Sequence, residues 1–319
     1  MEKQETAGSE TYMVVMGEFI NDGQPFHTRD IARLGLNRHD LRSAIRSHRL
    51  CKVFYAVYVD SHVPDSRWLR VTAAELVAPP HAIICDEFAS WLHGVDTFRP
   101  TDRHTLVPKM VVPHGTHRVT TAGVSCRHAK LPKPDVMEMS GMLVTTPVRT
   151  ASDLLRSLWR PYALAAADGM AHAGLIDSEQ VGAYLDRLRG YPGVVQGREL
   201  APLIEPGAAS PGESWQRLRI VDAGFPRPVI QFHLQDRLGF DRCLDLAYPE
   251  LLIAIEYDGR EFHTAEADRA HDAERRGGLE EAQGWRFFVS RREDIFGRDD
   301  RFERDLGKLL GRVPLPRNW

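Results

Sequence analysis

Residues 242–259 have the sequence RCLDLAYPELLIAIEYDG, and this stretch decides the fold predicted for the last third of the chain. Two apolar runs flank a Pro-Glu pair, a pattern typical of an antiparallel hairpin. Because side chains alternate along a strand, Glu256 and Asp258 point to the same face of the second strand. Asp245 lies on the first strand, within a pair or two of the level of Glu256. The predicted hairpin therefore gathers three carboxylates.

Three carboxylates this close repel one another unless a cation neutralises them. Mg²⁺ suits the site because it takes oxygen ligands and keeps several waters, and Mn²⁺ is the alternative ion. A bound Mg²⁺ activates a water and stabilises charge on a phosphoryl oxygen. His263 follows the flexible Gly259 and is a candidate general acid or base. Taken singly, these acids also fit strand-end solubility and His263 fits an ordinary surface position, but together they favour a metal site.

Further candidate residues lie on both sides of this hairpin. Glu213 ends a Ser-Pro-Gly-Glu run whose capping-box spacing also gives it a purely structural explanation. Asp272 and Arg275 lie three residues apart on a predicted helix, where they can pair with each other. We expect Gly277 and Gly278 to interrupt that helix, since each glycine costs roughly 1 kcal/mol relative to alanine.

The stretch from 210 to 310 resembles the Vsr-like branch of the restriction-endonuclease-like PD-(D/E)xK superfamily. The resemblance rests on the order of the following residues: Ser210-Pro-Gly-Glu213, Gly224-Phe-Pro-Arg-Pro228, Asp245, Glu256-Tyr-Asp-Gly259, His263, Asp272, Arg275, Leu279 and Gly284-Trp285. It implies that Asp245 and Glu256 bind the metal and that Asp258 stands where the superfamily has a lysine. It also implies that His263 assists proton transfer and that Glu213 reaches toward the same centre. The fold it implies is a mixed sheet flanked by helices.

A basic segment lies near the other end of the chain. Residues 27–52 carry seven Arg and Lys residues against two Asp residues, a net charge of +5, whereas the whole chain has a formal charge of -3. Two short helices around a glycine turn are predicted there, the second opening at Asn37, a good N-cap. Apolar spacing on this helix leaves four side chains on its outer face: Arg38, Arg42, Ser43 and Arg46. The β-branched and aromatic run at 51–59, which includes Lys52, predicts a hairpin.

Helix, turn, helix and hairpin in this order are typical of a winged helix. A helix fits the major groove of DNA, where arginines neutralise phosphates or bind guanine edges. We therefore expect DNA to contact the outer face of the second helix and the start of the hairpin, at Arg38, Arg42, Ser43, Arg46 and Lys52. A small helical domain with a solvated basic face is the alternative.

A second resemblance covers this segment. Residues 26–59, FHTRDIARLGLNRHDLRSAIRSHRLCKVFYAVYV, resemble the N-terminal winged helix of AbiE-type (type IV) antitoxins. That family usually has glycine in the hairpin where this chain has Ala56. Residues 81–94 and 142–155 resemble the body that follows the winged helix in those proteins. The middle of the chain is predicted to alternate helices, one of them over 82–92, with short strands.

Composition bounds the remaining possibilities. The 319 residues suffice for two or three domains, and we place them at 1–63 (winged helix), 64–205 (α/β body) and 206–319 (endonuclease fold). A chain that is 43% hydrophobic and 27% charged is not wholly disordered. Apolar runs far shorter than about 20 residues exclude a membrane span, and the first residues lack a secretion signal, so we expect a cytoplasmic protein. The four cysteines form no CxxC pair and are expected to be buried thiols.

The predicted fold class is therefore α/β, or α+β overall. The predicted function is Mg²⁺-dependent hydrolysis of DNA phosphodiester bonds, targeted by the winged helix. The alternative is a DNA-binding, antitoxin-like transcriptional regulator with a catalytically silent nuclease fold. A nuclease for RNA or mismatched DNA is a third possibility. Double-stranded DNA is the expected partner, while a homodimer and a toxin-like or operon partner stay open.

Overall fold

The computed structural model describes residues 20–98, 106–259 and 276–319. The fold is α+β overall, as predicted. The chain forms two compact units, the first made of residues 1–94 and 98–146 and the second of 95–97 and 147–319. The three-domain division at 63/64 and 205/206 stays a prediction. None of the described helices is long and apolar enough to cross a bilayer.

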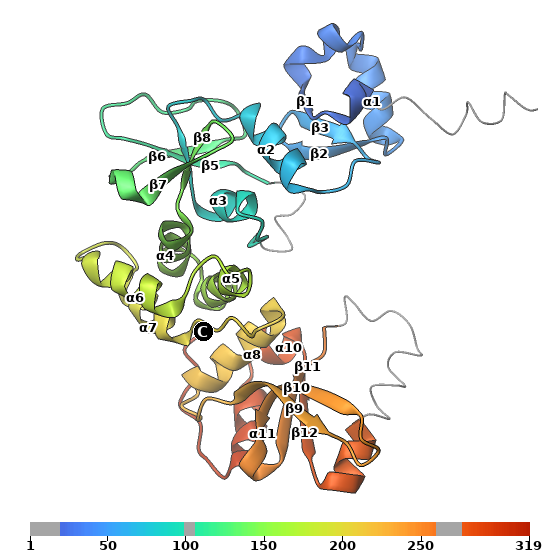
Figure 1. Cartoon of the computed structure of the whole chain (residues 1–319), viewed down its shortest axis with the longest axis vertical. Coiled ribbons are helices and arrows are strands. Elements are labelled where there is room, and N and C mark those ends of the chain that lie inside the picture. Colours follow the sequence, from blue (N-terminus) through green and yellow to red (C-terminus); the bar gives the residue numbers. More distant parts are fainter. Residues whose placement is uncertain (1–19, 99–105, 260–275) are drawn as a thin grey trace, which may run out of the picture. The chain divides into compact units, whose positions relative to one another are not determined.

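The first unit opens with the predicted winged-helix elements (Figure 1). Its helical elements are the 3-10 helices η1 (Ile20–Gly23) and η2 (Thr28–Leu34) and the α-helix α1 (Arg38–Arg46). Its strands are β1 (Phe26–His27), β2 (Leu50–Phe54) and β3 (Val57–Asp60), which form a sheet in the order β1-β3-β2. Gly35 ends η2 with a φ of 69°, and Asn37 caps α1. Both helices and the hairpin were predicted from these local signals.

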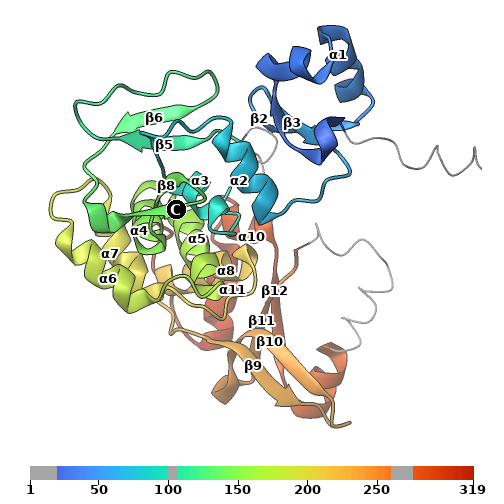
Figure 2. The ribbon, with the colours of Figure 1, turned by 45° about the horizontal axis from the view of Figure 1, so that its top comes forward.

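A five-stranded mixed sheet in the order β6-β5-β4-β8-β7 completes the first unit. Its strands are β4 (Ile83–Ile84), β5 (Lys109–Val112), β6 (Ser125–His128), β7 (Val136–Met139) and β8 (Met142–Thr145). The strands β5 and β6 lie side by side in both views of the ribbon (Figure 2). The helices α2 (Arg67–Glu75) and α3 (Asp86–Leu92) share an apolar core with this sheet, and the short 3-10 helix η4 (Lys133–Asp135) precedes β7.

The prediction of a helix over 82–92 is wrong at its first four residues. Ile83 and Ile84 pair with β5 on one side and with β8 on the other, and the helix begins at Asp86. Both isoleucines are β-branched, and as a strand they form backbone hydrogen bonds with neighbouring strands on both sides. The first turn of a helix would leave their backbone N–H groups without partners. The expectation of four buried cysteines is also wrong, because Cys51 is exposed and Cys126 and Cys243 are only partly buried.

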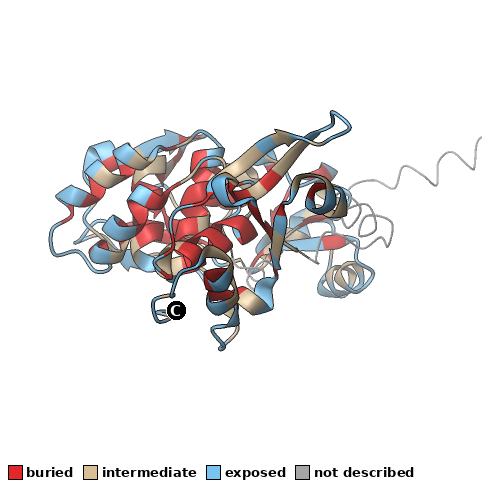
Figure 3. Ribbon diagram, turned by 90° about the horizontal axis from the view of Figure 1, so that it is seen from below, coloured by how far each residue is buried: buried red, intermediate tan, exposed pale blue. Residues whose placement is uncertain are grey.

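Helices form the first part of the second unit. They are α4 (Pro147–Ser157), α5 (Arg160–His172), α6 (Ser178–Arg187), α7 (Val194–Leu200) and the 3-10 helix η5 (Ala201–Leu203). Small and apolar residues such as Ala163, Ala167 and Leu185 pack at their centre with no exposed surface. Figure 3 marks the buried residues in red along the inner faces of helices and strands.

A four-stranded mixed sheet in the order β12-β11-β10-β9 forms the second part of this unit. Its strands are β9 (Val229–Gln235), β10 (Asp241–Tyr248), β11 (Ile253–Tyr257) and β12 (Arg286–Ser290), and the 3-10 helix η6 (Pro249–Leu251) joins β10 to β11. The β10 strand is antiparallel to both β9 and β11, whereas β11 and β12 are parallel. The predicted hairpin of β10 and β11 is confirmed.

Helices cover both faces of this sheet. On one face lie α8 (Pro211–Asp222), α10 (Arg292–Phe296) and α11 (Arg301–Leu310), whose apolar side chains pack on Leu246 and Ile255. On the other face Leu279, from the helical residues 276–283, packs with Ala254. The expected helix break at Gly277 and Gly278 is wrong, because both are helical. Burial of Leu279 outweighs the roughly 1 kcal/mol that each glycine costs.

Candidate nucleic-acid interface and carboxylate pair

The α1 helix presents a basic face to solvent. Arg38, Arg42, Ser43 and Arg46 are exposed, while Leu41 and Ile45 on the other side are partly buried. The helix begins at a full capping box: Asn37 accepts from the backbone of Asp40, and the Asp40 carboxylate accepts from the backbone nitrogen of Asn37 at 2.9 Å. Asp40 is thus committed to the helix end. Among the described residues no carboxylate pairs with the three arginines.

The hairpin of β2 and β3 adds one cation to the basic face of α1, and it packs against the rest of the first unit. Lys52 is exposed on β2 and likewise has no carboxylate partner among the described residues. Phe54 is 1% exposed and packs edge-on against Phe88 and Trp91, with ring centroids 5.3 and 5.5 Å away. The basic face is therefore held by a buried aromatic cluster.

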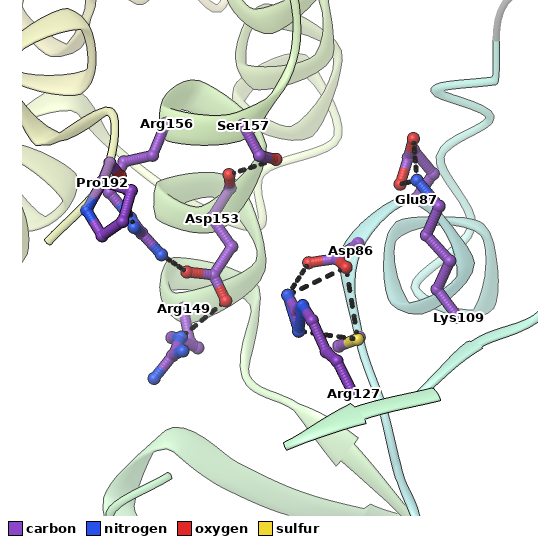
Figure 4. A network of polar contacts seen from close by, with 10 residues as sticks. Asp86, Glu87, Lys109, Arg127, Arg149, Asp153, Arg156, Ser157 and Pro192 are labelled. Atoms are coloured by element: carbon purple, nitrogen blue, oxygen red, sulfur yellow. Dashed lines mark hydrogen bonds and ion pairs between the residues drawn. The ribbon is translucent and has the colours of Figure 1, made fainter. Parts of the chain in front are cut away.

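Two polar networks, shown in Figure 4, were not predicted from the sequence. In the first unit Arg127 donates to both carboxylate oxygens of Asp86 at 2.8 and 3.0 Å, and Lys109 bonds both oxygens of Glu87. Asp86 is 8% exposed and has a φ of 56°, an uncommon backbone conformation for a residue other than glycine. An acidic pair that follows the buried run Ile83-Ile84-Cys85 is the local signal that marks this network.

The second network lies on α4, in the second unit. Asp153, 2% exposed, accepts from Arg149 at 2.7 Å and also pairs with Arg156. Arg149 donates to the hydroxyl of Tyr184 on α6, and Arg156 to the carbonyl of Pro192 at 2.8 Å. These contacts join helices and a loop, so their evident role is structural.

The predicted carboxylate site lies where β10 and β11 pair. Leu246 pairs with Ile255, so the next position along the ladder sets Asp245 opposite Glu256. Asp245 accepts from the backbone nitrogen of Tyr257 at 3.3 Å, and Glu256 is 8% exposed with Arg276 3.8 Å from its carboxylate. The structure therefore brings two of the three predicted strand acids together.

The other predicted acids have partners of their own. Arg291 donates to Asp258 at 2.9 Å. Glu213 lies in the first turn of α8 and accepts from the Ser210 hydroxyl at 2.8 Å, and Gln231 on β9 donates to it at 3.1 Å. Ser210 caps α8 by accepting from the Glu213 backbone nitrogen at 3.2 Å, while the Glu213 carboxylate accepts from the Ala209 backbone nitrogen and reaches β9.

Gln216 is a residue of this region that no local sequence pattern singles out. It is fully buried on α8, and its amide nitrogen donates to the Glu256 carbonyl at 3.0 Å and to the Ser290 hydroxyl at 2.9 Å. Gln216 therefore joins β11 to β12 directly behind Glu256.

Within the described ranges, no three His, Cys, Asp or Glu side chains are placed to hold a metal ion. His263, Asp272 and Arg275 lie outside the described residues, so their part in the site stays a prediction. The Mg²⁺ and Mn²⁺ expectations also stay predictions.

Comparisons with known proteins bear on the middle of the chain. Residues 82–203 match the family model of the AbiEi antitoxin C-terminal domain. The predicted resemblance of residues 81–94 and 142–155 to the antitoxin body is confirmed, and we call residues 82–203 the antitoxin-like body. The match does not reach residues 26–59, so their resemblance to the antitoxin winged helix stays a prediction. The Vsr-like resemblance of the last third stays a prediction.

The relatives of this chain include two proteins of Mycobacterium tuberculosis. They are the uncharacterized proteins MT2308 and Rv2248, each 29% identical over 278 residues, which is 87% of this chain and 96% of theirs. Among solved structures, the RV2827C protein of Mycobacterium tuberculosis matches 73% of this chain and 90% of its own, with 13% identity and a TM-score of 0.31. A likeness that weak says nothing further about the fold.

Proposed function

We propose that this protein is a DNA-binding, antitoxin-like regulator that contacts double-stranded DNA through α1. The observation that carries the proposal is the exposed face of α1, whose arginines have no carboxylate partner among the described residues. The antitoxin-like body that follows in the chain supports the same class of function. A toxin-like partner and a cytoplasmic location belong to this proposal.

The arginines are spaced to follow a DNA strand. Arg38, Arg42 and Arg46 are four residues apart and so lie in one row along the helix. Nine residues at 1.5 Å each give α1 a length of about 13 Å, enough for the major groove. When unpaired guanidinium groups in such a row contact phosphates, they displace cations condensed on the DNA, and the release of these cations drives binding.

Fluorescence anisotropy with a labelled duplex at several salt concentrations tests this proposal. We expect wild type to bind, and the variant Arg38→Ala/Arg42→Ala/Arg46→Ala to lose about 0.9 from the log-log salt slope for each phosphate contact removed. Lys133→Ala is the matched control, because Lys133 is an exposed cation of the same unit away from α1. Unchanged affinity and slope in the triple variant contradict the proposal.

A second candidate function is metal-dependent cleavage of DNA, and the pairing of β10 with β11 favours it. Asp245 and Glu256 face each other across the strands, and Mg²⁺ in proteins is held by one or two carboxylates together with waters. The ion would activate a water for attack on phosphorus. This proposal assigns the metal to Asp245 and Glu256, because these are the two acids that the pairing of β10 with β11 places opposite each other.

Cleavage of supercoiled, linear, single-stranded and G·T-mismatched DNA with Mg²⁺ or Mn²⁺ tests this second function. Asp245→Asn and Glu256→Gln are expected to abolish activity, while Glu250→Gln, an exposed acid in the turn between the same strands, keeps it. Retained DNA binding without cleavage on any substrate leaves the regulator as the function. Cleavage that survives both substitutions excludes these two carboxylates from the chemistry.

A further inference from the structure

A cavity of about 380 Å³ lies in the second unit, apart from both candidate sites. Its lining combines rings and guanidinium groups: Trp159, Arg219, Phe296, Gly297, Arg298, Arg317 and Trp319. The volume falls in the range of about 300–1,000 Å³ that small-molecule sites occupy. None of Glu213, Asp245 and Glu256 lines the cavity, so the cavity is not the carboxylate site.

The aromatic part of the lining is a connected wall. The ring of Trp159 lies 5.5 Å from that of Phe296 and 5.9 Å from that of Trp319, and Phe296 and Trp319 are 6.0 Å apart. Trp159 is nevertheless 51% exposed. A large ring that stays half-exposed at the mouth of a cavity offers a flat surface on which another planar group can stack.

The charged part of the lining is short of acids. Glu303 bonds Arg317 twice, at 2.8 and 2.9 Å. Asp222 accepts from the Trp319 indole at 2.6 Å, but it also pairs with Arg160. Arg298 is exposed and pairs with no carboxylate among the described residues. Within the described part of the chain, positive charge therefore exceeds negative charge around the cavity.

Arg219 forms the buried side of the cavity. Its side chain is 2% exposed and stacks on the Trp319 ring, with Cζ 3.3 Å from the ring centroid. Its terminal nitrogens donate to backbone oxygens of Trp319 and Ile295, but its Nε, 3.4 Å from Glu303, makes no hydrogen bond to any described residue. Burial, together with the charge of Arg317, lowers the pKa of Arg219 to about 10. The lowered pKa reflects chiefly the burial of the guanidinium group.

We propose that this cavity binds a nucleotide, with its phosphate at Arg298 and its base against the ring of Trp159. Arginine is the side chain best suited to phosphate, and exposed aromatic rings stack any of the bases. A free mononucleotide and the phosphorylated end of a nucleic-acid strand present this same chemistry. The cavity belongs to the second unit, whereas the proposed DNA-binding face of α1 belongs to the first.

Isothermal titration of the full chain with AMP, adenosine and inorganic phosphate tests the proposal. AMP is expected to bind at least about tenfold more tightly than either of its parts, because only AMP combines base stacking with the charged hydrogen bond to phosphate. Arg298→Ala and Trp159→Ala are each expected to weaken AMP binding about tenfold. Both residues are exposed, and a thermal melt of each variant checks that it is folded.

Arg304→Ala is the matched control, because Arg304 is an exposed arginine on the adjoining helix α11, pairs with Asp300 and does not line the cavity. Its affinity for AMP should equal that of wild type. The Arg38→Ala/Arg42→Ala/Arg46→Ala variant should also keep AMP binding, which separates this site from the proposed regulator function.

Titration with a single-stranded oligonucleotide carrying a 5′-phosphate distinguishes the two sources of nucleotide: tighter binding than AMP identifies a strand end, and equal or weaker binding identifies the free nucleotide. No AMP binding at millimolar concentration, or binding unaltered in Arg298→Ala and Trp159→Ala, overturns the proposal.

Discussion

Ala56 occupies a backbone conformation that suits glycine better than alanine. Its φ is 60°, and its carbonyl accepts from the backbone nitrogen of Thr28 at 2.8 Å, which fixes the turn of the hairpin against η2. A left-handed alanine costs roughly 1–2 kcal/mol, and glycine removes this cost. Part of the gain is offset, because glycine has greater conformational freedom in the unfolded chain. We predict that Ala56→Gly raises the free energy of unfolding by about 0.5 kcal/mol, measured by urea denaturation.

A β-branched residue at the same position should have the opposite effect. Valine is a genuine outlier at positive φ, so Ala56→Val should lower the free energy of unfolding by more than about 1 kcal/mol. Equal stability in the alanine, glycine and valine proteins would show that the turn relaxes out of the left-handed region. The residue that the antitoxin resemblance places here, glycine, is the one that the observed backbone favours.

At the scale of elements, the sequence predicts best where the signal is local. The cap at Asn37, the glycine that ends η2 and the apolar runs on either side of the turn at 249–251 each specify their element within a few residues. The pairing of Asp245 with Glu256 follows from the same hairpin. These parts of the fold and of the candidate site depend on neighbours in the chain.

Elements that depend on distant partners could not be predicted in this way. The two-residue strand β4 exists because β5 and β8 flank it, and β8 lies 60 residues later. Gln216 was missed for the same reason, since its partners are 40 and 74 residues away. Likewise, the cavity at Arg219 joins Trp159, which lies between α4 and α5, to residues near the end of the chain, and no spacing rule connects them.

One buried ion pair joins α5 to α8 and yields a prediction at this scale. Arg217, on α8, donates to Asp168, on α5, at 2.6 Å, and Asp168 also accepts from the backbone of Glu205 at 2.8 Å. Asp168 is 1% exposed. We predict that Asp168→Asn lowers the free energy of unfolding by about 3–5 kcal/mol, because Arg217 is left buried without a counter-charge.

The control for this pair is an exposed one on a neighbouring helix. Asp186, with its side chain 76% exposed, lies 3.4 Å from Arg198, and Asp186→Asn should change stability by less than about 1 kcal/mol. Chemical denaturation of both variants measures the difference. Similar losses in the two proteins would mean that burial does not strengthen the Asp168 pair.

At the scale of the whole molecule, the two compact units carry separate apolar cores. The first unit is centred on Phe54, Phe88 and the five-stranded sheet, and the second has cores around Leu185 and around Ile255. The proposed DNA-binding face belongs to the first unit, while the carboxylate pair and the nucleotide cavity belong to the second. The antitoxin-like body contributes residues to both, since its match at 82–203 spans the boundary at 146/147.

Separate cores predict separate unfolding transitions, because cooperativity extends only as far as shared burial. We expect differential scanning calorimetry of the full chain to resolve two transitions. Phe54→Ala removes a side chain that is 1% exposed in the first core. It should lower the midpoint temperature of one transition, because the first unit loses about 3–5 kcal/mol of unfolding free energy. Asp168→Asn should lower only the other. A single transition that both substitutions shift equally would show that the two units unfold together. DNA bound at α1 would then affect the nucleotide cavity only by raising the stability of the whole chain.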